Sequence, residues 1–147
     1  WDEIDLDNGL WTIPAQRMKT AEEHVVPLSD AALDILKPLS ETRVSEYVFP
    51  GQKPGKPLSG MAMEMLLRRM KIGDATVHGF RSSFRDWCGD KTNFPREVAE
   101  AALAHKVGSD VERAYRRSKA LEKRRDLMSA WADYCDASTA NVVQLVQ

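Results

Sequence analysis

The sequence predicts an α+β domain, mostly α-helical, in which a small N-terminal antiparallel sheet of three strands packs on a bundle of helices. Two observations carry this prediction. Short apolar runs that alternate with polar residues are confined to residues 1–28, and such alternation is typical of half-buried strands. From residue 29 onward, helix-capping side chains and prolines separate longer segments that have apolar residues at helical spacing.

The three predicted strands are residues 1–5, 10–14 and 24–28. Between the first two, Asp7, Asn8 and Gly9 form a turn signal, because these residue types accept the backbone angles of tight turns. Between the second and third, the polar residues 16–20 are expected to form a hairpin tip. His24 lies on the third strand, where we expect it to have a structural role.

Residues that accept hydrogen bonds from free backbone N–H groups predict where the helices begin. Ser29 precedes a helix over residues 30–36, which Pro38 is expected to end. Ser59 precedes a helix that reaches about residue 70, and Thr76 precedes one that reaches about residue 89. The sequence therefore places its first three helices after the sheet.

The second half of the chain is predicted to be helical as well. Pro95 is expected at the first position of a helix that leads to His105. Ser109 and Glu112 fit a capping box, which predicts another helix start. A last long helix is expected over about residues 119–134, with a partial apolar stripe.

The domain is expected to span residues 1–135, followed by a tail over residues 136–147. The end of the tail, residues 141–146, is apolar and β-prone, so it could add a strand to this sheet or to that of a neighbouring protomer. The chain opens on Trp1 without an initiator methionine or a signal peptide. We therefore expect it to be part of a longer protein.

Composition narrows the class of protein. The hydrophobic fraction of 43% is enough for a core, and no apolar run approaches the roughly 18 residues of a membrane span. Cys88 and Cys135 do not make a disulfide framework, which favours a reducing cytosol. The net charge is −1, but residues 51–125 carry 17 Lys and Arg against 9 Asp and Glu. That basic segment suits a polyanion, although solvated charged helices would give the same count.

His78 and Arg81 are the first candidates for a functional site. Three residues apart near a helix start, they share one face close to free backbone N–H groups, which suit a phosphate. Arginine can donate to two phosphate oxygens, and histidine can donate a hydrogen bond or move a proton near neutral pH. The alternative is structural, with His78 partly buried and Arg81 paired with Asp86 or Asp90.

The other candidates lie on both sides of that pair. Tyr115 follows His105 by ten residues and precedes Arg116 and Arg117, which are candidates for phosphate contacts. A phenol can attack phosphorus if its proton is removed and cations stabilise the product. Lys19, at the predicted hairpin tip, could protonate a departing alkoxide as a general acid. Taken singly, each has a commoner structural explanation: core or interface for a tyrosine, a solvated loop for a lysine.

In their order and spacing, these residues resemble the tyrosine recombinase family, and within it the phage-type integrases. The matching segments cover about residues 1–135 and read WDEIDLDNGLWTIPAQRMK, HVVPLS, YVFPG, TVHGFRSSFRDW, FPREVAEAALAH, AYRR and EKRRDLMSAWADY. The set HGFR, ALAH and AYRR in this order is specific to the family. The resemblance supports the catalytic domain fold predicted above.

The resemblance implies a role for each candidate. Tyr115 would attack a DNA phosphodiester, leaving a 3′-phosphotyrosyl bond and a 5′-hydroxyl, and Lys19 would protonate the departing 5′-oxygen. Arg81, His78 and His105 would hold the phosphate, and His78 would also handle the tyrosine proton. No metal or other cofactor is implied, because cationic side chains stabilise the transition state.

The resemblance also implies partners and a setting. The substrate would be double-stranded DNA attachment sites, and the reaction would integrate or excise phage or mobile-element DNA. The full-length protein would form a tetramer on DNA, together with accessory DNA-bending proteins. We expect it in the cytoplasm of a bacterial host, associated with the nucleoid and not with a membrane.

One part of the family pattern is missing from these 147 residues. The family carries another catalytic arginine in a segment that resembles TGxRxGE, ahead of the first strand. We therefore expect this chain alone to be a poor recombinase, with apolar surface exposed where that segment would pack. Two alternatives stay open: a type IB topoisomerase, which shares the catalytic residues, and a catalytically incomplete DNA-binding module.

Overall fold

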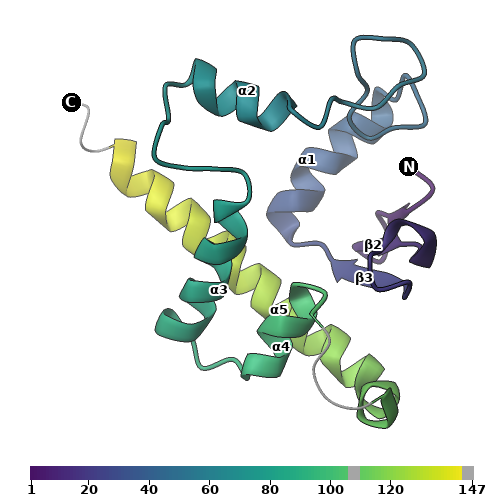
Figure 1. Ribbon diagram of the computed structural model, residues 1–147, viewed down its shortest axis with the longest axis vertical. Helices are drawn as coiled ribbons and strands as arrows, with labels where there is room; N and C mark the ends of the chain where they lie inside the picture. The colour runs from purple at the N-terminus through teal and green to yellow at the C-terminus, as the bar shows by residue number, and fades with distance from the viewer. Residues whose placement is uncertain (106–109, 144–147) are drawn as a thin grey trace.

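The computed structural model of the chain describes residues 1–105 and 110–143, with side chains described for residues 1–105 and 120–137. Within these ranges, five α-helices follow a three-stranded antiparallel sheet (Figure 1). The predicted α+β class is therefore confirmed. None of the helices in the described ranges has the length and apolar character needed to cross a membrane.

The sheet has the strand order β1-β2-β3, and both pairs are antiparallel. Its strands are β1 (Ile4–Asp5), β2 (Leu10–Ile13) and β3 (His24–Pro27). Gly9 allows the first turn, because its φ of +62° is unfavourable for residues with a Cβ atom. The second connection contains a short 3-10 helix, η1 (Ala15–Arg17), where a simple hairpin tip was expected.

The helices are α1 (Asp30–Glu41), α2 (Ala62–Arg69), α3 (Gly79–Lys91), α4 (Arg96–Ala102) and α5 (Asp110–Val143). The predicted cap at Ser29 is confirmed, because its Oγ accepts from the Ala32 N–H at 3.4 Å. Thr76 is not the N-cap of α3, a position that His78 occupies; its Oγ1 accepts from the Gly79 N–H at 3.0 Å in the turn ahead of the helix. Ser59 lies just ahead of α2, where its Oγ accepts from the Met61 N–H at 3.3 Å. A side-chain cap therefore begins α1, whereas the Ser59 and Thr76 hydroxyls accept hydrogen bonds just ahead of α2 and α3.

Pro38 does not end helix α1, so that prediction was wrong. The helix continues to Glu41. Proline has no N–H to donate to the carbonyl of Asp34, but Asp34 and Pro38 are both exposed, so water can take that hydrogen bond. The Pro38 carbonyl accepts from the N–H and the hydroxyl of Thr42, at 3.3 and 3.1 Å, and this closes the last turn.

Helix α5 is longer than the sequence predicted. It runs unbroken for 34 residues, so the segment that carries Tyr115 and the predicted last helix are one element. Residues 136–143 belong to it, where a tail with a strand was expected; extending an existing helix costs less than starting a new element. The predicted capping residue Ser109 and residues 144–147 lie outside the described residues.

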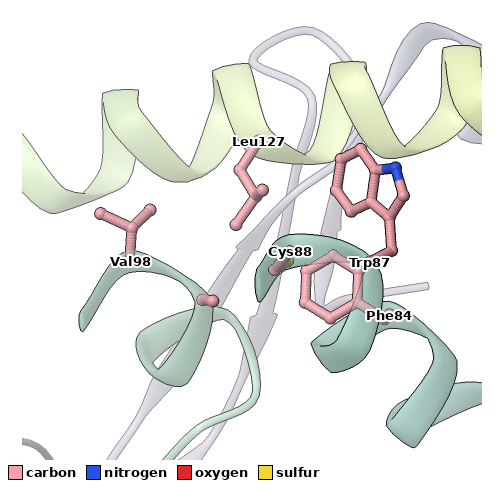
Figure 2. Close-up of a cluster of buried hydrophobic side chains, with 6 residues drawn as sticks. Phe84, Trp87, Cys88, Val98 and Leu127 are labelled. Atoms are coloured by element: carbon pink, nitrogen blue, oxygen red, sulfur yellow. The ribbon is translucent and has the colours of Figure 1, made fainter. Parts of the chain in front are cut away.

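The main core lies where α3 and α4 pack on the middle of α5. Figure 2 shows Leu127 of α5 pointing between Val98 of α4 and Cys88 of α3. The Leu127 side chain is 0% exposed, the lowest value among the buried core residues. Beside it, the rings of Trp87 and Trp131 have centroids 5.1 Å apart, a separation typical of favourable aromatic pairs.

The sheet is held on α5 by arginine side chains. Arg124 Nη1 donates to the Val25 carbonyl of β3 at 2.7 Å, and Arg125 Nη2 donates to the Asn8 carbonyl at 3.3 Å. Burial lowers the pKa of the Arg124 guanidinium from its ordinary value. These two arginines of the basic segment therefore serve the fold.

His24 connects the sheet to the end of helix α4. Its half-buried imidazole donates a hydrogen bond to the Ala102 carbonyl. Burial lowers the pKa of His24 below 6.5, and the positive charge of Arg124 lowers it further. The structural role expected for His24 fits this contact, because the ring joins strand β3 to the end of helix α4.

Helix α2 lies apart from the bundle of α3, α4 and α5 (Figure 1). Its apolar side chains, and those beside it, are exposed; they are Met61, Met63, Met65, Leu66 and Met70. So many exposed large apolar side chains around one short helix are unusual for a monomeric protein.

We predict that Leu127→Ala lowers the free energy of unfolding by about 2–5 kcal/mol, because it leaves a cavity at a fully buried position. Urea denaturation followed by circular dichroism measures the change. Leu66→Ala, on exposed α2, is the matched control and should change the free energy of unfolding by less than about 0.5 kcal/mol. Equal effects of the two substitutions would contradict the assignment of the core.

We also predict that the protein loses stability as the pH falls through about 6.5. The pKa of His24 is lowered in the folded state, so the unfolded chain binds more protons at that pH. Denaturation at pH 7.5, 6.5 and 5.5 should show the loss, and His24→Gln should reduce it. His78→Gln, at an exposed histidine, should not; the same pH dependence in the wild type and in His24→Gln would contradict the prediction.

Candidate active site

His78 is the residue that immediately precedes helix α3. The turn is closed by the Gly79 N–H, which donates to both the carbonyl and the hydroxyl of Thr76 at 3.0 Å. A Cβ atom at Gly79 would lie 3.1 Å from that hydroxyl, so the Thr76 side chain would have to shift slightly to admit another residue. The His78 side chain is exposed and forms no hydrogen bond within the described part of the chain.

Arg81 lies in the first turn of α3 and reaches the end of α4. Its Nη2 donates to the Leu103 carbonyl at 2.6 Å and lies 2.5 Å from Nε2 of His105. The structure therefore joins two of the predicted site residues, which are 24 positions apart in the sequence. The structural alternative, in which Arg81 pairs with Asp86 or Asp90, is wrong.

His105 is placed by the way helix α4 ends. Ala104 has a φ of +57°, in the left-handed region. Its N–H donates to the Ala101 carbonyl at 3.1 Å, and the His105 N–H donates to the Glu100 carbonyl at 2.9 Å. These two bonds define a Schellman motif, a common helix end that reverses the chain. The motif turns His105 back along its own helix.

Glu100 is a site residue that the sequence reasoning missed. Its Oε2 lies 2.6 Å from His105 Nδ1, and its Oε1 accepts from Arg85 Nε at 2.8 Å. Its side chain is only 13% exposed. The hydrogen bonds from His105 and then from Arg85 lower the pKa of the Glu100 carboxyl below its usual value, so it is ionised at neutral pH. The spacing of five residues between Glu100 and His105 was the available signal.

The arginines around Glu100 outnumber the carboxylates that pair with them. Arg85 and, at 3.7 Å, Arg96 share the single carboxylate of Glu100, which also contacts His105 Nδ1. Arg81 is exposed and pairs with no carboxylate among the described residues. Its remaining N–H groups donate to none of the described side chains, and a guanidinium can donate to two oxygens of one anion.

The other predicted site residues are placed less completely. Lys19 is exposed in the turn that follows η1, and it contacts none of the described site side chains. Tyr115, Arg116 and Arg117 lie on the backbone of α5, but their side chains are outside the described residues. The described histidines, cysteines and carboxylates form no cluster of three that could hold a metal ion.

Comparisons with known proteins agree on one family. The chain matches the model of the phage integrase family over residues 1–122. It is 44% identical over 150 residues to prophage integrase IntA of Escherichia coli strain K12, covering 99% of this chain and 36% of the relative. It is 35% identical to the integrase of Shigella phage Sf6 over 140 residues, covering 92% of this chain and 36% of the relative.

A third relative is the integrase of Enterobacteria phage P4, which is 34% identical over 164 residues, covering 99% of this chain and 37% of the relative. The chain thus spans just over a third of the length of these relatives. No solved structure gave a significant match. Matched over residues 1–122, with Arg81 and His105 side by side, the chain belongs to the phage integrase family.

Proposed function

We propose that this chain is the catalytic part of a site-specific DNA recombinase that cuts DNA through Tyr115. The observation that carries the proposal is the contact between Arg81 and His105, because it brings together two groups that can bind a phosphate, one on α3 and one just after α4. The names of the relatives, which are integrases, support integration or excision of phage or mobile-element DNA as the reaction.

The proposed reaction is a transesterification. The Tyr115 oxygen attacks the phosphorus, the bond from phosphorus to the 5′-oxygen breaks, and a 3′-phosphotyrosyl bond forms. His78 takes the phenol proton, and Lys19 gives a proton to the departing 5′-oxygen. The phosphotyrosyl bond retains the energy of the phosphodiester, so the 5′-hydroxyl of another strand can reverse the step without ATP.

Arg81 and His105 stabilise the charge that develops on the non-bridging oxygens of the phosphate. Guanidinium and imidazolium groups aimed at such oxygens act mainly on the transition state, and one such donor is worth about 100- to 1,000-fold in rate. Arg116 and Arg117 contact neighbouring DNA phosphates. In the full-length protein, the partners are double-stranded attachment sites, further copies in a tetramer, and accessory DNA-bending proteins.

We predict that Tyr115→Phe abolishes the covalent adduct between the full-length protein and DNA, a loss of at least about 1,000-fold, because the nucleophile is removed. Arg81→Ala should slow the adduct by about 100- to 1,000-fold. The assay uses a nicked duplex from the ends of the genetic element that encodes the protein, resolved on a denaturing gel. Tyr134→Phe is the matched control and should react normally; an adduct with Tyr115→Phe would refute the nucleophile.

We further predict that the 147-residue chain alone forms the adduct at least about 100-fold more slowly than the full-length protein, because these residues lack the family's other catalytic arginine. The same nicked duplex measures this, and robust adduct from the chain alone would overturn the prediction. Relaxation of a supercoiled plasmid without attachment sites, by the full-length protein, would instead favour a type IB topoisomerase. DNA binding without any adduct would favour a binding module.

A further inference from the structure

The contacts of Glu100 fix the chemistry of the His105 ring. Arginine nitrogens are only donors, so the 2.5 Å contact between Arg81 Nη2 and His105 Nε2 requires a lone pair on Nε2. Glu100 is ionised and is only an acceptor, so the 2.6 Å contact with Nδ1 requires a proton on Nδ1. The two contacts together favour the tautomer that carries its proton on Nδ1, toward Glu100, and its lone pair on Nε2, toward Arg81.

Glu100 is itself held in place by helix α3. Arg85 Nε donates to the other carboxylate oxygen at 2.8 Å, so Oε2 is left for the histidine. The Glu100 backbone carbonyl also accepts from the His105 N–H, at 2.9 Å. Glu100 thus contacts His105 through both its main chain and its side chain, and α3 fixes the orientation of the carboxylate.

We propose that Glu100 is a positioning residue for DNA cleavage: it holds the Nδ1 proton of His105 and so directs Nε2 at the place where Arg81 binds the phosphate. This inference rests on the proposed function. It adds Glu100, which Arg85 holds in place, to the residues that position the catalytic side chains.

The arrangement has a consequence for phosphate binding. For Nε2 to donate to a phosphate oxygen, the N–H of Arg81 moves from Nε2 to the phosphate, and His105 takes one proton from solvent at Nε2. The new imidazolium faces the Glu100 carboxylate at Nδ1, which balances its charge. The other described charges that face this pair are Arg81 and Arg85 of α3 and Arg96 of α4.

The first test measures the tautomer of His105 in the 147-residue chain, through two-bond ¹⁵N–¹H spectra of the imidazole rings. We expect the neutral ring to carry its proton on Nδ1 in the wild type. In Glu100→Ala the share of rings protonated on Nε2 should rise, because only the contact with Arg81 then still favours Nδ1. His105→Gln identifies the signals. A wild-type ring protonated on Nε2, or a tautomer unchanged in Glu100→Ala, would overturn the proposal.

The second test measures adduct formation by the full-length protein over a range of pH. We expect Glu100→Ala to slow it by about 10- to 100-fold, as is usual for groups that orient a functional histidine. Glu100→Gln keeps the shape of the side chain but removes the negative charge that balances the His105 imidazolium. As the pH is raised, the rate of adduct formation should therefore begin to fall at a lower pH in Glu100→Gln than in the wild type. A purely structural role would lower the rate equally at every pH, and that outcome would also overturn the proposal.

Glu97→Gln is the matched control, because Glu97 is an exposed glutamate on the same helix. It should leave the tautomer, the rate and its pH dependence unchanged. If Tyr115→Phe is inactive while Glu100→Gln behaves as wild type, the positioning role fails and the proposed function stands. If Tyr115→Phe is active, the proposed nucleophile fails, and the tautomer still tests the contact between Glu100 and His105.

Discussion

The packing of α3 and α4 around Leu127 is the contact on which the rest of the molecule depends. Arg81 comes from α3 and His105 follows α4, so their distance is set by how these helices dock on α5. The salt bridge between Arg85 and Glu100 also joins α3 to α4, on the side that faces the site. An apolar core and a polar contact therefore fix the same pair of helices, and the core supplies most of the stability.

The arginines of this chain serve two different purposes. Arg124 and Arg125 donate to backbone carbonyls of the sheet and its first turn, and Arg85 orients Glu100. Arg81, by contrast, is exposed and pairs with no described carboxylate. The charge of the basic segment therefore overstates how much of it can face DNA, since guanidinium groups that hold the fold contribute little to a phosphate-binding surface.

Local signals predicted the elements well, because strands and helix caps depend on neighbouring residues. The cap at Ser29 and the three strands are examples. Errors arose where solvent exposure or the low cost of extending a helix determined the length of an element. Helix α1 continued past Pro38, and α5 extended through residues 136–143. Glu100 was missed because its role depends on the left-handed backbone of Ala104 and on Arg85 from another helix. Neither can be read from residue types alone.

Because α5 is one unbroken helix, it connects the position of the proposed nucleophile directly to the core. The backbone position of Tyr115 and the buried anchor Leu127 are twelve residues apart on one helix, or about 18 Å at 1.5 Å per residue. A tilt of roughly 5° about that anchor would displace the tyrosine backbone by about 1.6 Å, and a misplacement of about 1 Å can cost a factor of about 100 in rate. If Tyr115 is the nucleophile, as proposed, the stiffness of α5 between Leu127 and Tyr115 is therefore one determinant of the cleavage rate.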